Sequence, residues 1–249
     1  MKLSLAEPKV LVDSINVISE LVNEVRLKID KDKIELVAMD PANVAMVIFN
    51  LLSSAFTEYK VDKPEEIGIS LDSLKAILRR VKPSDVISIE LDKERNRLKI
   101  QLRSENVRTF NLALIDIEDK HQKIPDLNFP LKVEMNSVVF DEAVQDMDVI
   151  AESVVLVVDK DRFLVEAESN LSDAKSEIGK DSGVIIKTNT KEAVKSKYSI
   201  EYLKKIIKGS KLSDKVNIQF SKDYPLRVDY LVKDRLSLTV ILAPRVSND

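Results

Sequence analysis

The chain has no cysteine and no tryptophan, and glycine, histidine and aromatic residues are scarce among its 249 residues. Without cysteine it has no disulfide framework, no thiolate metal site and no cysteine nucleophile, so we expect an intracellular location. No apolar run approaches the roughly 20 residues of a membrane-spanning helix, and the N-terminus lacks the charged and apolar regions of a signal peptide. The sequence therefore predicts a globular protein that does not enter a membrane.

Residues suited to catalysis are also rare. The only histidine, His121, lies in the polar stretch IEDKHQKIP, and we interpret it as a solvated loop residue. The four glycines do not pair as a phosphate-binding loop requires. They are Gly68, Gly179, Gly183 and Gly209. The sequence therefore indicates no catalytic residue and no cofactor.

Two pairs of aspartates, Asp30/Asp32 and Asp159/Asp161, have a spacing that metal loops use. A calcium loop also needs a glycine and a distal bidentate glutamate, and neither is in register here. We interpret both pairs as hairpin turns and expect no metal site.

One hairpin pattern occurs twice in the chain. IDKDKIELVAMD at residues 29–40 is repeated as VDKDRFLVEAES at residues 158–169, which is a shift of 129 (159 minus 30). The same shift aligns the segment from Val10 with that from Val139, and the segment from Ser70 with that from Ser199. A repeat of this length indicates two domains of one architecture.

We expect the first domain over residues 1–116 and the second over 131–249. The intervening 117–130 is polar and acidic with two prolines, and we interpret it as an interdomain connecting loop.

Each half is itself doubled, as strand, helix and three strands. Period-two alternation marks the strands. Apolar residues recur at intervals of three and four residues in four segments, which we expect to be short helices. These lie near 9–22, 72–81, 141–151 and 201–209. Each helix has one apolar stripe to bury, most simply against a sheet. Few helices and many short hairpins predict an α+β fold with antiparallel sheets.

Positive charge recurs at equivalent places in the two halves, although the formal net charge is −3. Lys75, Arg79 and Lys82 are spaced by four and three, which favours one helix side. With the cations 129 residues later and their neighbours, the set is Lys75, Arg79, Arg80, Lys82, Lys204, Lys205, Lys208 and Lys211. A charged helix face is usually solvated surface. Its recurrence favours contact with a phosphate backbone without sequence readout, and the lack of interleaved aromatics argues against base contacts.

The other two expected helices expose mainly acids. Their outward residues are Asp13, Asn16, Glu20, Glu142, Asp146 and Asp148. Contact with DNA would then be patchy and weak, which suits sliding better than holding.

Three stretches carry a family resemblance: LVAMDPANVAMVIF (36–49), KIPDLNF (123–129) and VILAPRV (240–246). In their order and spacing the chain resembles the DNA sliding clamps, the proliferating cell nuclear antigen and its archaeal relatives, over essentially its whole length. The resemblance implies a ring of three two-domain subunits joined head to tail, with helices lining the hole and sheets forming the wall. It also implies that the strand around Arg108–Leu114 pairs with a neighbour's strand around Leu171–Ile178, which would cover exposed strand edges.

The resemblance further implies a pocket for a short apolar and aromatic peptide from partner enzymes. By position it would use Met39, Asn43, Val44, Ile124, Pro125, Pro225, Ile241, Ala243, Pro244 and Arg245. Two residues depart from the family pattern, Gln122, where relatives often place an apolar residue, and Ile241, where some carry tyrosine. These departures predict a pocket whose shape and partner preference differ from those of the relatives.

The function implied is a non-enzymatic processivity factor that encircles duplex DNA and serves the replicative DNA polymerase. The expected partners are duplex DNA, DNA polymerase, the clamp loader, a flap nuclease and ligase, the enzymes through clamp-binding peptides. The expected location is with chromosomal DNA, in the cytoplasm of an archaeon or the nucleus of a eukaryote. Two alternatives stay open: a specialised heterotrimer or checkpoint-type clamp subunit that acts as an interaction scaffold, and a metal-dependent nuclease.

Overall fold

A computed structural model describes residues 1–118 and 122–245 of the chain. The chain divides into two compact units. Unit 1 comprises Met1–Pro41, Val47–Gln122 and Val232–Ser237, and unit 2 comprises Ala42–Met46, Lys123–Leu231 and the residues from Leu238 onward. His121, predicted as a solvated loop residue, lies outside the described residues.

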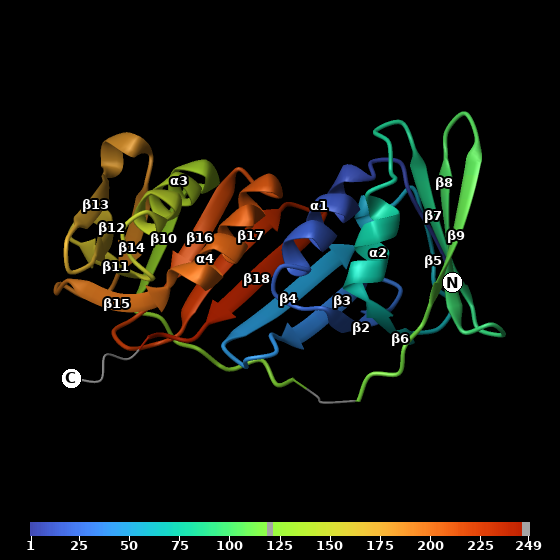
Figure 1. Ribbon diagram of the computed structural model, residues 1–249, viewed down its shortest axis with the longest axis horizontal. Helices are drawn as coiled ribbons and strands as arrows, with labels where there is room; N and C mark the ends of the chain where they lie inside the picture. The colour runs from blue at the N-terminus through green and yellow to red at the C-terminus, as the bar shows by residue number, and fades with distance from the viewer. Residues whose placement is uncertain (119–121, 246–249) are drawn as a thin grey trace. The chain divides into compact units, whose positions relative to one another are not determined.

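Unit 1 holds the elements of the first half of the chain (Figure 1). In chain order they are β1 (Lys2–Leu5), α1 (Lys9–Ile18), β2 (Glu24–Ile29), β3 (Lys33–Met39), β4 (Ala45–Leu52), η1 (Ser53–Ala55), β5 (Glu58–Lys60), β6 (Glu65–Ser70), α2 (Leu71–Leu78), β7 (Val86–Asp92), β8 (Arg97–Arg103) and β9 (Val107–Ala113). The first residues of β4 belong to unit 2. Unit 1 contains the strand orders β5-β1-β7-β8-β9 and β4-β3-β2-β6.

Unit 2 repeats this plan in the second half of the chain (Figure 1). Its elements are β10 (Leu131–Asn136), α3 (Ser137–Asp148), β11 (Ser153–Asp159), β12 (Arg162–Glu168), β13 (Asp173–Ile178), η2 (Lys180–Ser182), β14 (Ile185–Thr188), β15 (Val194–Ser199), α4 (Ile200–Ile206), η3 (Ile207–Lys211), β16 (Lys215–Gln219), β17 (Leu226–Val232) and β18 (Leu236–Leu242). Its strand orders are β14-β10-β16-β17-β18 and β13-β12-β11-β15.

The shift of 129 residues seen in the sequence holds in the structure. It maps β3 onto β12, β6 onto β15, β8 onto β17 and β9 onto β18 with the same first and last residues. The strands pair antiparallel within both units. The predicted α+β fold of two similar domains, each built twice from strand, helix and three strands, is therefore confirmed, with β5 and β14 as short additions.

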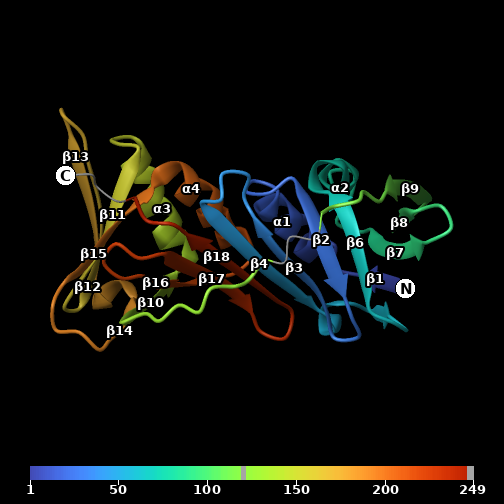
Figure 2. The ribbon, with the colours of Figure 1, turned by 90° about the horizontal axis from the view of Figure 1, so that it is seen from below.

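In each unit two helices lie side by side, α1 with α2 and α3 with α4 (Figure 2). Their apolar stripes are buried as predicted, with Leu74 and Leu78 on α2 and Leu203 on α4 among the core residues. Burying each such side chain contributes about 2 kcal/mol. None of the helices within the described ranges is long and apolar enough to span a membrane.

The helix ends differ from the prediction. The second helix ends at Leu78 instead of residue 81, and the third runs from Ser137 to Asp148 instead of 141–151. The third begins early because the Asn136 side chain accepts a hydrogen bond from the Val138 backbone N–H at 2.9 Å and caps the helix. Apolar periodicity locates a buried face but contains no information about such a cap.

The predicted hairpin turns are formed. The Asp30 carboxylate accepts the backbone N–H groups of Asp32 at 2.8 Å and Lys33 at 3.0 Å. The Asp32 N–H in particular lowers the Asp30 pKa below its ordinary value. Asp30 is thus used as a turn residue that satisfies its own backbone.

Candidate DNA-facing, subunit-contact and peptide-binding surfaces

The predicted DNA-facing cations of unit 1 lie on α2 and in the turn that follows it. Lys75 is on the helix, and its Nζ lies 3.6 Å from a Glu20 carboxylate oxygen. Arg79 is the exposed C-cap, while Arg80 and Lys82 are exposed in the turn. The expectation that Lys82 shares a helix face with Lys75 and Arg79 is therefore wrong, because the helix ends before it.

In unit 2 the corresponding cations continue along the helix. Lys204 lies 2.7 Å from Asp148, and Lys205 lies 3.1 Å from Glu201 and over the Tyr202 ring at 5.1 Å. The half-buried Lys208 and the exposed Lys211 belong to η3, which follows α4 directly. Lys82 and Lys211 therefore occupy equivalent positions in the repeat but different local structures.

The sequence predicts outward acids on the neighbouring helices but not their pairing with these cations. Glu20 follows α1 and Asp148 ends α3, so each unit pairs a cation of its second helix with an acid of its first. The Lys204–Asp148 pair is exposed and the Lys75–Glu20 pair is half-buried. Ion pairs at the protein surface contribute only about 0–1 kcal/mol. A phosphate group would displace the carboxylate at little cost, so the pairing is compatible with weak DNA contact.

A buried ion pair holds the turn of unit 1. The fully buried Asp85 accepts the Lys82 backbone N–H at 2.6 Å and the Arg108 guanidinium from β9. Arg108 also donates to the Arg80 carbonyl oxygen at 2.7 Å. The Lys82 N–H and then Arg108 lower the pKa of Asp85 below its ordinary value. This contact fixes the backbone that carries Arg80 and Lys82 against β9.

Sequence reasoning missed Asp85 for a clear reason. The stretch KPSDV has the composition of a solvated turn, and no local pattern connects it to a residue on β9. Only the pairing of β8 with β9 brings Arg108 to the turn.

The two strands predicted to join subunits are both at sheet edges. β9 is the last strand of the order β5-β1-β7-β8-β9, and β13 is the first of β13-β12-β11-β15. Val107, the first residue of β9, is 59% exposed, and Leu171, just before β13, is 96% exposed. Each edge thus presents backbone groups that another strand could pair with.

The predicted peptide-pocket residues belong to unit 2 apart from Met39. Within unit 2, the Ala243 backbone N–H donates to the Val44 carbonyl at 2.9 Å, which brings the end of β18 to the segment before β4. Asn43 has φ 57°, a left-handed conformation that asparagine tolerates. Ile124 and Pro125 are exposed, as a peptide-binding loop requires.

Other members of that set are placed differently. Pro225 and Pro244 are half-buried, while Ile241 is only 7% exposed and belongs to the core. The Arg245 side chain donates to Ser153 at 2.7 Å and lines a hollow of about 490 Å³ beside α3. That hollow is otherwise lined by residues 148–152, Ile200 and Glu201. The Arg245 side chain therefore lies toward the start of β11 and the residues at the end of α3.

No group of three histidine, cysteine, aspartate or glutamate side chains suited to a metal ion occurs in residues 1–118 and 122–245. The acids described above are engaged in turns and ion pairs instead.

The fold defines a class: a duplicated α+β chain whose strands β9 and β13 lie at sheet edges, one in each unit. Family models cover both halves, "Proliferating cell nuclear antigen, N-terminal domain" over residues 1–122 and the "C-terminal domain" over 123–245. The chain belongs to the proliferating cell nuclear antigen family.

Relatives from archaea share about a third of the sequence. The chain is 33% identical to the DNA polymerase sliding clamp of Pyrococcus furiosus, over 93% of each chain. It is 34% identical to that of Thermococcus gammatolerans, over 96% of this chain and 95% of the relative. For the clamp of Nanoarchaeum equitans the identity is 31%, over 98% of this chain and 99% of the relative.

Solved structures have the same fold. The proliferating cell nuclear antigen of Thermococcus kodakaraensis superposes with a TM-score of 0.92 at 23% identity, covering 98% of this chain and 99% of that one. A chain of the PCNA2–PCNA3 complex of Sulfolobus tokodaii has a TM-score of 0.90 at 23% identity, with the same coverage.

Proposed function

We propose that this chain is a subunit of a DNA polymerase sliding clamp, a ring of three copies that encircles duplex DNA and keeps the replicative polymerase on its template. The observation that carries the proposal is that β9 in unit 1 and β13 in unit 2 are both edge strands. The proposed activity is supported by the relatives that are named DNA polymerase sliding clamp. The ring would act without catalysis, with chromosomal DNA in an archaeal cell.

Ring closure follows from where the two edges lie in the chain. The edge strand β9 belongs to unit 1 and the edge strand β13 to unit 2. The two differ in sequence, so one copy's β9 would meet the next copy's β13 head to tail. A contact of this heterologous type closes into a ring when its rotation divides a full turn. With two like units per subunit, three copies would place six similar helix pairs around the hole.

DNA contact would come from the cations of α2, α4 and the segments after them. Lys75, Arg79, Arg80 and Lys82 in unit 1 and Lys204, Lys205, Lys208 and Lys211 in unit 2 would face the duplex. Their acidic neighbours keep the attraction small. Weak, sequence-independent contact lets a ring slide, because topology rather than affinity retains it on the duplex.

Partner enzymes would bind through short peptides carrying aliphatic and aromatic side chains. The connecting loop, which we place at residues 117–130 between domains 1–116 and 131–249, would contribute Ile124 and Pro125. The segment before β4, Pro225 and the end of β18 would contribute the rest. DNA polymerase, clamp loader, flap nuclease and ligase are the proposed partners.

The alternative is a subunit of a heteromeric clamp. The PCNA2–PCNA3 complex is a structural neighbour in which two different clamp proteins associate. The edges β9 and β13 would serve either arrangement, so the mass of the isolated chain distinguishes the two.

The experiment that tests encirclement compares circular with linear DNA. The purified clamp is loaded onto a nicked circular plasmid by its clamp loader, and retention is followed by gel filtration. We expect the clamp to stay on the circle and to be lost within minutes of linearisation by a restriction enzyme. Equal loss from intact and linearised plasmid would contradict a ring, and metal-dependent cleavage of the plasmid would contradict a non-catalytic role.

A further inference from the structure

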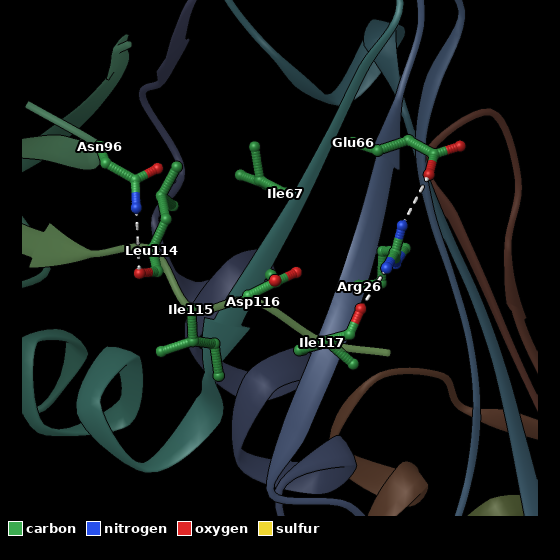
Figure 3. A pocket seen from close by; sticks show the side chains of 9 residues that line it. Arg26, Glu66, Ile67, Asn96, Leu114, Ile115, Asp116 and Ile117 are labelled. Atoms are coloured by element: carbon green, nitrogen blue, oxygen red, sulfur yellow. Dashed lines mark hydrogen bonds and ion pairs between the residues drawn. The ribbon is translucent and has the colours of Figure 1, made fainter. Parts of the chain in front are cut away.

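A polar hollow of about 370 Å³ lies in unit 1 where the chain leaves β9 (Figure 3). Its lining includes Arg26 from β2, Gly68 from β6, Asn96 from the turn between β7 and β8, and residues 114–117. Residues 114–117 lead directly into the connecting loop. The hollow therefore marks where that loop is attached to unit 1.

Backbone hydrogen bonds hold the departing chain at two points. The Ile115 N–H donates to the Gly68 carbonyl at 3.0 Å, forming an isolated antiparallel bridge with β6. The Leu114 N–H donates to the Asn96 carbonyl at 3.0 Å, and the Asn96 side-chain amide reaches the Leu114 carbonyl at 3.5 Å. Strand β6 and the turn between β7 and β8 thus hold the same short segment.

Arg26 adds a side-chain contact further along. Its guanidinium donates to the Ile117 carbonyl and, at 3.2 Å, to the Glu66 carboxylate (Figure 3). The ion pair with Glu66 orients the guanidinium, because a planar group that is hydrogen-bonded to one acceptor can rotate little. Ile117 is the first residue of the loop.

Gly68 permits the close approach of the two backbones. A Cβ at this position would lie 2.2 Å from the Ile115 carbonyl oxygen and 3.0 Å from Ile117 Cγ1. A backbone atom cannot move aside as a side-chain end can, so any other residue would push the segment away from β6.

The second unit makes a related hydrogen bond without a glycine, but from one residue further along. Lys197 is equivalent to Gly68 (197 minus 129), and its carbonyl accepts the Arg245 N–H at 2.8 Å. The equivalent of Ile115 is Pro244 (244 minus 129), which has no N–H to donate. The Lys197 side chain is exposed, so the passing chain leaves room for it. Of these two equivalent positions, the tight fit occurs at Gly68, in the unit whose departing chain continues into the connecting loop.

The far end of the loop is also fixed, within unit 2. Phe129 packs edge-on against Tyr224 with ring centroids 5.6 Å apart, and the Pro130 carbonyl accepts the Asn189 N–H at 3.0 Å. Between these ends lie Ile124 and Pro125. A loop held at both ends loses less conformational freedom when a bound peptide orders it. The affinity of the loop for that peptide is therefore higher.

We propose that Arg26, Gly68 and Asn96 form a loop anchor: they are positioning residues that fix the start of the connecting loop and thereby set the affinity of the peptide pocket. This inference rests on the proposed function, because it assumes that Ile124 and Pro125 contact a partner peptide. The anchor residues themselves do not touch the peptide.

The test compares Gly68→Ala and Arg26→Ala with wild type. The matched control is Gly179→Ala, since a Cβ there meets nothing within 4 Å. The probe is a fluorescein-labelled synthetic peptide with adjacent aromatic residues and one aliphatic residue, titrated by fluorescence anisotropy. Trypsin cleavage after Lys123 reports the loop without any peptide, and light scattering reports assembly.

We expect Gly68→Ala and Arg26→Ala to weaken peptide binding about three- to tenfold, as partial loss of preorganisation predicts. Trypsin should cleave after Lys123 faster in both anchor variants, while the mass of their assembly stays at the wild-type value. The Gly179→Ala control should bind the peptide with wild-type affinity. Arg26→Lys, which keeps the charge, should recover part of the affinity. If Gly68→Ala fails to fold, the half-exposed Arg26 variants supply the result.

Unchanged peptide affinity in the anchor variants, with wild type binding normally, would overturn the anchor and leave the proposed function standing. Failure of wild type to bind the peptide would contradict the pocket itself and the inference with it. In that event faster cleavage after Lys123 in the variants would still show that the residues hold the loop.

Discussion

Unit 1 and unit 2 share one strand framework but present their cations in different ways. In unit 1 the helix ends at Leu78, and the following turn is pinned by Asp85 and Arg108. In unit 2 the helix continues as η3, where Gly209 lies against the ring of the buried Tyr230. The two units share the same sheets, because strands require only an alternation of apolar and polar residues. The segments that follow the second helix of each unit differ in structure.

The equivalent aspartates show the difference most directly. Asp85 is fully buried beside Arg108, whereas its counterpart 129 residues later, Asp214, is exposed. At the position equivalent to Arg108 stands Ser237. One residue type at one place in the repeat therefore has a structural role in unit 1 that it lacks in unit 2.

The largest effect should come from Asp85→Ala. Removing Asp85 leaves the mostly buried Arg108 guanidinium without this carboxylate and still bonded to the Arg80 carbonyl. We expect a loss of about 3 kcal/mol in the free energy of unfolding. Urea denaturation followed by circular dichroism measures it. Asp214→Ala is the matched control in unit 2 and should change stability by less than about 0.5 kcal/mol. Equal losses in the two variants would remove the contrast between the units.

The corresponding test in unit 2 is Gly209→Ala. A Cβ at Gly209 would lie 2.3 Å from Tyr230 Cε2, and that ring is fully buried and cannot move aside. Overpacking should outweigh the roughly 1 kcal/mol gain in helix propensity and leave a net loss of about 2 kcal/mol. Denaturation of Gly209→Ala beside Gly179→Ala measures this, and a stabilised Gly209→Ala protein would show that the fit is loose.

A third comparison reverses one cation in each unit. Arg79→Glu and Lys208→Glu should each lower the slope of log affinity for a labelled duplex against log salt by about 1. Stimulation of the polymerase should fall in both variants, and the mass of the assembly should stay unchanged. An effect confined to one variant would mean that only that unit faces DNA.

The smallest expected effect is the loss of the Asp85 contribution to stability at low pH. Because the folded-state pKa of Asp85 lies below its ordinary value of 3.8, its contribution to the free energy of unfolding is complete above that pH. The contribution is lost as the pH falls through the folded pKa. The stability difference between wild type and Asp85→Asn should therefore be constant near pH 6 and shrink below pH 3.8. A difference independent of pH would mean that Asp85 acts without its charge.

The strand framework was predictable because its signals are local or repeated. Alternation on β7 and β8 marks the strands, and the shift of 129 was visible in the hairpins around Asp30 and Asp159. The helix ends were less predictable, since the cap at Asn136 depends on one side-chain hydrogen bond. The edge positions of β9 and β13 came from the family resemblance rather than from any residue pattern.

The candidate sites were predictable as residue sets but not as contacts. Lys75 and Lys204 were identified from their spacing, yet their pairing with Glu20 and Asp148 depends on helix packing. Arg108 was assigned to a subunit edge, while its bond to Asp85 requires the β8–β9 pairing. The role of Gly68 was invisible because it depends on the distance to a backbone 47 residues away (115 minus 68).

One measurement tests the central claim that β9 and β13 join copies of this chain. Multi-angle light scattering on the purified protein gives the mass in solution directly. The account predicts three times 28.1 kDa, independent of concentration well above the dissociation constant. A constant mass of 28.1 kDa up to high concentration would contradict a ring of identical subunits.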